Sequence, residues 1–557
     1  MKIPNPKKDE LYFLPLGGSG EIGMNFNLYG YKGKWLIVDC GVTFGDNIHG
    51  SIDVAMPDIV SIENEKEKLC GLLLTHAHED HIGAVHHLWP YLKCPVYATE
   101  FAAEILKRKL SEVGLEDEVE INIIDINSKL TIEKFKIEVI SMTHSILEPV
   151  SLIIETEVGK IFHTGDWKID YNPQMGKGLE KTKLIELANQ NILAMVCDST
   201  NVFETGYSGS EEDVISSLTK IINSSKNRVF VTTFASNIVR LRTISKIAIT
   251  AGRRVALVGQ SMWRMVDAAK QCGYLHDLPS FISEKDVGLF PKNKILIICT
   301  GSQGEPRAAL SRITNGIHKD VNISEGDCIV FSSRVIPGNE ISIFNLQNKL
   351  SDLGVEIIES SKDNLVHVSG HPSRNELSDM YSWVKPNTLI AVHGENRHIN
   401  EHVKYAKEQQ IPNALSARNG TIIQLGPGDP RYIGEVESGR LVLDGNDIIS
   451  RDSEVFKLRH KMMYNGAIYV VLVMDKSFNL LHSPSIMLEG VAEVINEDDP
   501  IIKTKQFIIS EIDKYKKARG FSKEYIENTI TDFVKKFIRQ EYSKRPIVKV
   551  EVIVNKK

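Results

Sequence analysis

The chain of 557 residues alternates short apolar runs with amphipathic segments. Residues 11–16, 34–40 and 69–75 are apolar runs of strand length. Apolar positions at helical spacing follow from about residue 82 to 92 and again over residues 100–112. Strands that alternate with helices in this way predict a layered α/β core.

A second α/β pattern interrupts the first. Strands of the first pattern are expected near residues 121–124, 137–141 and 152–156 and, after a long interval, near 421–425 and 440–442. Within the interval, four apolar runs alternate with helical stretches: Val229–Thr233, Arg254–Leu257, Lys294–Cys299 and Cys328–Ser332. A chain of this length is expected to form two to four domains.

The last hundred residues have a pattern of their own. Residues 446–460 are polar and predict a linker that is partly helical. Strands are then expected at residues 466–475, 485–491 and 548–554, around helices at 503–519 and 523–542. This order predicts a small, separate α+β domain.

Composition and charge indicate the cellular compartment and the kind of partner to expect. The N-terminus is polar and no run of eighteen apolar residues occurs, so we expect neither a signal peptide nor a membrane span. The seven cysteines are scattered and form no Cys-x-x-Cys pair, which favours buried thiols in a reducing cytoplasm over metal ligands. The net charge is −6, yet residues 503–557 hold 15 Lys and Arg against 7 Asp and Glu. This basic end fits either a polyanion-binding appendage or a solvated helix face.

Candidate chemistry begins directly after the strand at residues 69–75. His76, His78, Asp80 and His81 follow within six residues. In an extended backbone residues i and i+2 face the same way, so His76 and His78 can bind one ion together. Asp80 and His81 begin the next turn and point toward a second position. Nitrogen and carboxylate ligands suit zinc, with manganese as the competitor. The alternative is a polar turn whose histidines only cap a helix.

Three further candidates follow other expected strands. His144 comes after the strand at 137–141, Asp166 after residues 160–163, and His393 after the run Leu-Ile-Ala-Val. Polar residues at strand ends collect at the sites of layered α/β folds. The interval between Asp166 and His393 is 393 − 166 = 227 positions, long enough for a domain inserted between two ligands of one site. His163 is interpreted as structural.

Three loops of the interval are rich in Ser, Gly and Asn. They are Thr233–Asn237, Thr300–Pro306 and Val368–Ser373. Exposed backbone amides beside small side chains can hold phosphate without many lysines. Plain strand–helix connections are the alternative interpretation.

Together these motifs resemble a known group of nucleases. The spacing His-x-His-x-Asp-His resembles the metallo-β-lactamase superfamily of two-metal hydrolases. An insert with Asp198-Ser-Thr, Ser-Gly-His371 and Val-His393-Gly-Glu resembles its β-CASP group. Gly-Ser-Gln-Gly-Glu-Pro and Thr-Phe-Ala-Ser-Asn are similar to the motifs of the ribonuclease J family. Two departures are visible: Val239 replaces a histidine common in the family, and Pro372 follows His371 where a small residue is common.

The resemblance implies an α/β fold, with a metallo-β-lactamase αββα sandwich core, an inserted α/β β-CASP domain and a small C-terminal α+β domain. The expected boundaries are 1–205 and 366–445 for the core, 206–365 for the insert, 446–460 for the linker and 461–557 for the C-terminal domain.

The resemblance also implies roles for the candidate residues. His76, His78 and His144 would bind one Zn2+, Asp80, His81 and His393 a second, and Asp166 would bridge them. Two Zn2+ per subunit are expected, with Mn2+ or Mg2+ as substitutes. His371 is the expected general acid. Asp198 would orient an imidazole, or would only cap a helix. A pocket for a 5′-monophosphate would consist of Phe234, Ala235, Ser236, His367, Val368, Ser369, Gly370 and His371.

The implied activity is hydrolysis of RNA, as a 5′-to-3′ exonuclease with additional endonuclease activity, in mRNA decay and rRNA maturation. A β-CASP nuclease acting on DNA and an inactive RNA-binding scaffold are the alternatives. The complete set of seven ligands argues against an inactive scaffold, because a degenerate site would have lost at least one of them. The resemblance further implies single-stranded RNA as partner, a homodimer or a dimer of dimers, and contact with RNA-degradation machinery.

Overall fold

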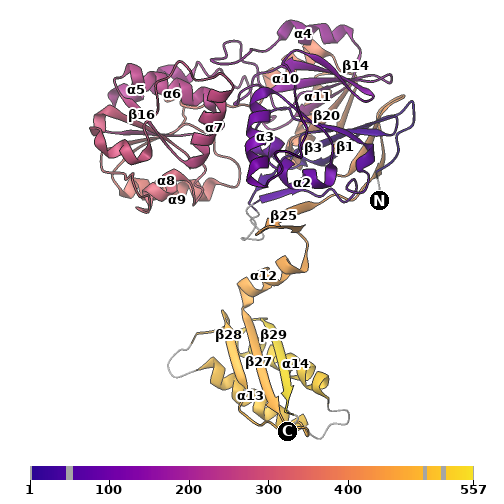
Figure 1. Cartoon of the computed structure of the whole chain (residues 1–557), viewed down its shortest axis with the longest axis vertical. Coiled ribbons are helices and arrows are strands. Elements are labelled where there is room, and N and C mark those ends of the chain that lie inside the picture. The colour runs from indigo at the N-terminus through magenta and orange to yellow at the C-terminus, as the bar shows by residue number, and fades with distance from the viewer. Residues whose placement is uncertain (1–2, 46–53, 494–498, 516–521, 556–557) are drawn as a thin grey trace. The chain divides into compact units, whose positions relative to one another are not determined.

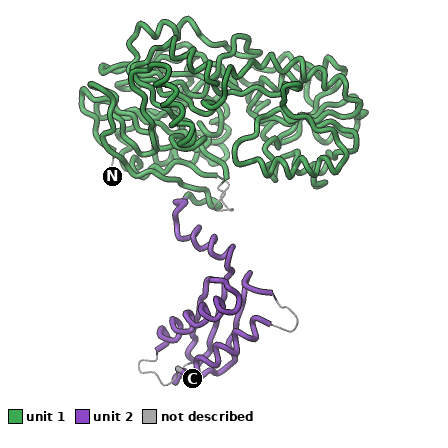
Figure 2. The backbone as a smooth tube through the Cα atoms, turned by 180° about the vertical axis from the view of Figure 1, so that it is seen from behind, with its two compact units in different colours: residues 1–45, 53–448 green, residues 46–52, 449–557 purple. Residues whose placement is uncertain are grey.

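The computed structural model describes residues 3–45, 54–493, 499–515 and 522–555. These residues form two compact units, one up to residue 448 and one from residue 449 (Figure 2). No helix among the described residues is both long and apolar enough to cross a membrane.

Two large sheets form the core of the first unit (Figure 1). In spatial order the first comprises β24 (Arg431–Glu435), β23 (Thr421–Gly426), β1 (Leu11–Gly17), β3 (Phe26–Tyr31), β4 (Lys34–Val38), β7 (Leu69–Leu73), β8 (Val96–Ala98) and β9 (Ile121–Ile123). The second comprises β10 (Lys129–Ile132), β11 (Phe135–Ser141), β12 (Val150–Glu155), β13 (Lys160–His163), β14 (Ile192–Asp198), β20 (Thr388–Val392) and β22 (Asn413–Ser416).

The sheets pack face to face and helices cover their outer faces. One buried cluster joins Phe13 and Leu36 of the first sheet to Ile137 and Leu152 of the second. The first sheet's outer face is covered by α2 (Val85–Leu92) and α3 (Glu100–Glu112), and the second's by α4 (Lys181–Glu186), α10 (Arg374–Val384) and α11 (Asn396–Glu408). This confirms the predicted αββα sandwich.

The helix expected from about residue 82 is divided in two. A short helix, α1 (Glu79–Ile82), precedes α2, so Asp80 and His81 lie on a helical turn. The carbonyls of Glu79 and His81 accept hydrogen bonds from Val42 N and Cys40 N, which ties this turn to the chain after β4. A side chain at Gly83 would come within 2.5 Å of Glu79 O, so the break needs glycine.

The insert leaves and re-enters the second sheet between neighbouring strands. β14 and β20 pair in parallel, with Asp198 opposite Val392, although nearly two hundred residues separate them in the chain. The insert's own sheet is wholly parallel: β16 (Arg254–Val258), β17 (Ile295–Cys299), β15 (Val229–Thr232), β18 (Cys328–Phe331) and β19 (Glu356–Ile358). Its helices are α5 (Val214–Ser224), α6 (Ile238–Thr250), α7 (Gln260–Gln271), α8 (Ala309–Thr314) and α9 (Glu340–Asp352). The predicted inserted α/β domain is therefore present, whereas its exact boundaries stay predictions.

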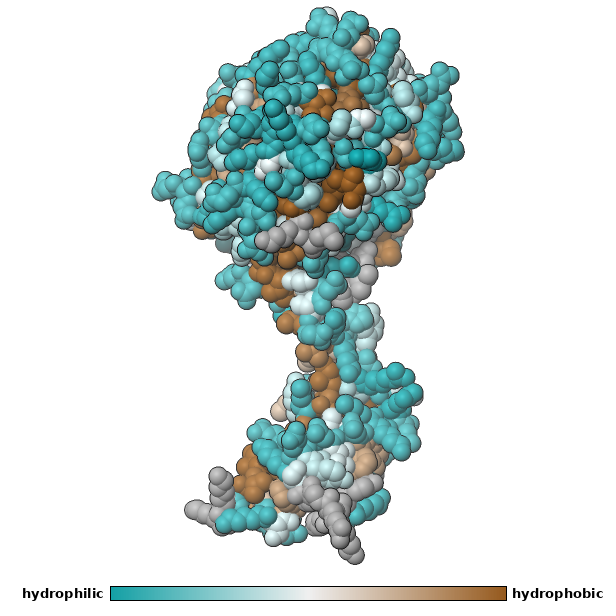
Figure 3. Space-filling model, turned by 90° about the vertical axis from the view of Figure 1, so that its right-hand side faces the viewer, coloured by the Kyte–Doolittle hydropathy of each residue, from teal (hydrophilic) through white to brown (hydrophobic). Residues whose placement is uncertain are grey.

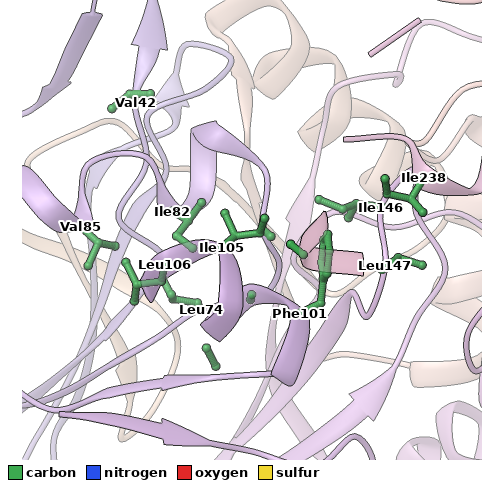
Figure 4. Close-up of a cluster of buried hydrophobic side chains, with 14 of the residues drawn as sticks. Val42, Leu74, Ile82, Val85, Phe101, Ile105, Leu106, Ile146, Leu147 and Ile238 are labelled. Atoms are coloured by element: carbon green, nitrogen blue, oxygen red, sulfur yellow. The ribbon is translucent and has the colours of Figure 1, made fainter. Parts of the chain in front are cut away.

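The insert shares its apolar packing with the core. Figure 4 shows Phe101 of α3 near Ile146 and Leu147 of the loop after β11, with Ile238 of α6 beyond them; all four belong to one buried cluster. In the same loop, the carboxylate of Glu148 accepts from Phe101 N at 2.8 Å and from Tyr274 Oη at 2.9 Å. Because Tyr274 follows α7, this carboxylate connects the core to the insert.

The second unit has a separate core. Strands β28 (Ser485–Glu489), β27 (Ala467–Met474) and β29 (Ile547–Val554) form its sheet, which packs on α13 (Pro500–Tyr515) and α14 (Lys523–Tyr542). This is the expected α+β domain. The last residues of the helix predicted at 503–519 lie outside the described residues. The predicted linker contains β26 (Asp447–Ser450) and most of α12 (Glu454–Asn465), which exposes Leu458 and Met463. The face drawn in Figure 3 is mostly hydrophilic, with scattered hydrophobic patches.

Candidate metal centre

Three histidines and one aspartate converge at the ends of β7, β11 and β13. His76 Nε2 and His144 Nε2 each lie 3.1 Å from His78 Nδ1, and Asp166 Oδ2 lies 3.8 Å and 3.7 Å from the first two nitrogens. Their ligand atoms all fall within 4.8 Å of one another. Three imidazole nitrogens and a carboxylate oxygen at this separation can surround one divalent cation.

A second donor group shares Asp166 with the first. His81 Nε2 lies 3.2 Å from Asp166 Oδ2, and His393 Nδ1 lies 3.1 Å from Asp166 Oδ1. Asp80 Oδ2 completes the group at 3.2 Å from His393 Nε2. Because the two oxygens of Asp166 face different donors, this carboxylate can bridge two ions. All seven predicted ligands thus come together, and their division between two ions stays a prediction.

A third group of close donors extends past the predicted ligands. It contains Asp166, Asp198, His371 and His393. His371 Nδ1 donates to Asp198 Oδ2 at 2.7 Å, while Asp198 Oδ1 accepts from Thr200 N at 2.8 Å. No helix begins at Asp198, so its contact with Thr200 closes a turn. Asp198 therefore both closes a turn and orients the His371 imidazole.

Buried neighbours fix the ligand rings. His144 Nδ1 donates to Gly370 O at 2.6 Å and His81 Nδ1 to Asp39 Oδ2 at 2.7 Å, which leaves Nε2 of each ring for an ion. Sequence reasoning missed Asp39, whose signal is the same as that of Asp166: a carboxylate directly after an apolar strand. His393 has a left-handed backbone with φ of 52°, a conformation that costs about 1–3 kcal/mol outside glycine. His163, interpreted as structural, hydrogen-bonds Tyr29.

The electrostatics favour the protonation states of metal ligands. Burial holds the pKa of His76 and of His144 well below the usual value and lowers that of His78 to about 4, so these rings are neutral. Burial raises the pKa of Asp166, but His393 and His81 outweigh it and keep the carboxyl ionised. His81 and His393 have raised pKa values because nearby carboxylates outweigh burial. A divalent cation would take the place of those protons.

The seven side chains therefore fit a metal-binding site. Five imidazoles and two carboxylates form a nitrogen-rich donor set, which zinc favours and manganese tolerates. The cysteines are unpaired and six of the seven are buried, and none joins a donor group among the described residues.

Arg240 links the two loops that were predicted to form a terminal pocket, and the pocket itself stays a prediction. The loop with Phe234, Ala235 and Ser236 precedes α6, whose Arg240 is fully buried. Arg240 Nη1 donates to Val366 O at 2.9 Å, directly before His367.

His367 is a buried, neutral imidazole. Burial holds the pKa of His367 well below normal, and Arg240, Lys168 and Arg334 lower it further. Each of these cations is itself paired with a carboxylate: Arg240 with Glu211, Lys168 with Asp170 and Arg334 with Glu204. His367 Nδ1 is buried without a hydrogen-bond partner among the described residues.

The third Gly-rich loop, Thr300–Pro306, contacts a neighbouring loop of the insert. Gln303 Nε2 donates to Arg334 O at 2.8 Å, and Gln303 Oε1 accepts from Ile336 N at 2.9 Å. The Gly-Ser-Gln-Gly-Glu loop therefore holds the Arg334 loop in place. Two residues were noted above as departures from the motifs of the family that the sequence resembles. Val239 is buried in α6 and lines a cavity of about 30 Å³ with His144. Pro372 is buried directly after His371.

Comparison with known proteins gives the same order of domains. The model of the beta-lactamase superfamily domain matches residues 34–188, and that of the ribonuclease J beta-CASP domain matches residues 226–350. A Zn-dependent metallo-hydrolase RNA specificity domain matches residues 357–415, and the ribonuclease J C-terminal domain matches residues 454–555.

Relatives are similar over nearly the whole chain. Ribonuclease J of Sinorhizobium meliloti is 40% identical over 548 residues, which cover 97% of each chain. Ribonuclease J2 of Bacillus subtilis is 30% identical over 97% of this chain and 98% of its own. A crystal structure of a protein of unknown function from Enterococcus faecalis covers 74% of this chain and 100% of its own, with a TM-score of 0.52 and 17% identity, which supports the fold alone. The chain belongs to the ribonuclease J family and is an RNA-processing nuclease.

Proposed function

We propose that this nuclease removes nucleotides from the 5′ end of single-stranded RNA, prefers a 5′-monophosphate and also cleaves internally. The observation that supports this most is the pairing of two features in one unit: donor groups that share Asp166, and nearby small-residue loops in which His367 Nδ1 is buried without a hydrogen-bond partner among the described residues. The first supplies cleavage chemistry, and the second supplies a place for a terminal phosphate.

The donor groups would hold two Zn2+, with His76, His78 and His144 at one ion, Asp80, His81 and His393 at the other, and Asp166 between them. Bound there, the ions would activate water as a nucleophile and neutralise charge on the phosphodiester. Mn2+ or Mg2+ would act as substitutes.

His371 would donate the proton that the leaving 3′ oxygen of the sugar needs. Burial lowers the pKa of His371, but Asp198 and Asp166 outweigh it and raise the pKa overall, which favours the protonated ring that a general acid needs. Asp198 accepts from Nδ1, which leaves Nε2 free to face the reacting phosphate. A positioned acid of this kind contributes about 10²–10⁴-fold to rate.

The pocket would bind the 5′-monophosphate through Ser236, Ser369 and the amides around them. A 5′-hydroxyl would leave buried donors unpaired, at about 1–3 kcal/mol each. A 5′-triphosphate would be too large and too highly charged for a closed pocket. In the cell, this activity fits mRNA decay and rRNA maturation in the cytoplasm, by a homodimer or dimer of dimers that joins RNA-degradation machinery.

The test uses RNAs with a monophosphate, triphosphate or hydroxyl at the 5′ end, a matched DNA, and measurement of bound zinc. Release of 5′-labelled mononucleotide fastest from monophosphorylated RNA is the expected result. Equal rates on all three RNAs would leave an endonuclease. Equal cleavage of DNA would contradict RNA specificity, and absence of cleavage with full zinc would indicate an RNA-binding scaffold.

A further inference from the structure

Asn201 links three functional segments through one buried amide. It lies three residues after Asp198 and is 3% exposed. Its Nδ2 donates to Ser369 Oγ at 2.7 Å and to His371 O at 3.0 Å. Its Oδ1 accepts from Arg334 Nη1 at 2.6 Å. Both amide hydrogens and the amide oxygen of Asn201 thus take part in hydrogen bonds.

Arg334 is itself held at both ends. Its backbone carbonyl accepts from Gln303, as described above, and its Nη2 donates to Glu204 Oε1 at 2.7 Å. The guanidinium therefore lies between the insert and the segment after β14. Through Asn201, Arg334 is therefore connected both to Ser369 of the proposed pocket and to the backbone of His371, the proposed acid.

We propose that Asn201 and Arg334 are positioning residues that set the His371 imidazole at the leaving oxygen and couple its placement to occupation of the terminal pocket. The proposal rests on the proposed function, in which His371 is the acid and Ser369 lines the pocket. Asn201 determines where the backbone of His371 lies, and Asp198 determines how its ring is turned. Neither side chain is available to an ion: the arginine is a cation, and the amide of Asn201 is engaged by Ser369, His371 and Arg334.

The nature of the leaving group distinguishes this role of Asn201 from a purely structural role in holding the loop closed. If Asn201 acts through the acid, its loss should slow only reactions in which the leaving oxygen must be protonated. A bridging 3′ sulfur at the scissile bond leaves as a thiolate, which needs no proton. The ratio of wild-type to variant rate on the two substrates cancels any direct preference of the ions for sulfur.

The experiment compares Asn201→Ala, Arg334→Gln and the wild type on 5′-monophosphorylated RNA with a 3′ oxygen or a 3′ sulfur at the first linkage. Asn201→Ala should lower kcat on the oxygen substrate by about 10–100-fold and on the sulfur substrate by less than about threefold. Arg334→Gln should show a smaller split in the same direction and a weaker preference for monophosphate ends.

Two substitutions outside the proposed site serve as controls. Asn315→Ala, at the end of α8, and Arg242→Gln, which loses only its contacts to Asp277 and Gln174, should leave both rates unchanged. Bound zinc should stay equal in all variants. Equal losses on both substrates, or no loss on either, would overturn the inference while the wild type still cleaves RNA. If the wild type cleaves neither substrate, the proposed function fails instead. Because Arg334 is half exposed, Arg334→Gln provides the test even if Asn201→Ala does not fold.

Discussion

The candidate metal centre and the loops of the proposed terminal pocket both lie at strand ends, yet they are held in different ways. The donors of the metal centre come from the core alone and face one another across a few ångströms, with carboxylates compensating buried imidazoles. The pocket joins loops of the insert to a returning core segment through hydrogen bonds of Arg240 and Asn201. The first arrangement is needed for any cleavage. The second should decide which RNA is cleaved and how well the acid is placed.

The largest effect should follow from Asp80→Ala. Asp80 lies on α1 and is partly exposed, so its loss removes a donor without opening the core. RNA cleavage should fall by at least about 10³-fold, and bound zinc should fall toward one ion per chain. Glu79→Gln, one residue earlier and with its carboxylate paired with Lys109, is the matched control. A near wild-type rate for Asp80→Ala would contradict the two-metal assignment.

His371→Ala should cause the next largest loss, because it removes the proposed acid and leaves the seven ligands. The rate on RNA should fall by about 10²–10⁴-fold while bound zinc stays unchanged. Loss of an ion with this variant would instead make His371 a ligand, as its closeness to Asp166 and His393 allows.

Ser236→Ala should change selectivity more than rate. With one donor removed from the pocket, the preference for monophosphate over hydroxyl ends should shrink by about tenfold, equivalent to about 1.4 kcal/mol. Ser369→Ala should shrink it too, with an added loss of rate because Ser369 also contacts Asn201. Internal cleavage by Ser236→Ala should match the wild type, as should both activities of the control Ser224→Ala on α5. An unchanged end preference would place the terminal phosphate elsewhere.

The smallest effect on chemistry is expected from truncation near Arg451. This removes the second unit with its separate apolar core and leaves every donor of the metal centre. RNA binding or self-association should weaken, measured by titration and by mass in solution, while cleavage continues at high protein concentration. A truncated protein that is monomeric and fully active on long RNA would show that the unit is dispensable.

The same contrast explains what the sequence alone could predict. Four ligands stand within six residues, so local spacing was enough to find the first part of the metal centre. Asp39 and Asn201 went unnoticed because their roles come from partners 42 and 168 positions away in the chain. The break between α1 and α2 was also missed, since it depends on hydrogen bonds to the segment after β4 rather than on periodicity. Burial and strand order were predictable from apolar runs, but contacts across the insert were not.

The apolar cluster shared by the core and the insert has a thermodynamic consequence. Since Phe101, Ile146, Leu147 and Ile238 pack in one buried cluster, and Glu148 ties α3 to Tyr274, neither domain can melt without exposing the other's side chains to water. Heating should therefore unfold the first unit in a single calorimetric transition, despite its two domains. The second unit, whose buried cluster is its own, should absorb heat in a transition of its own.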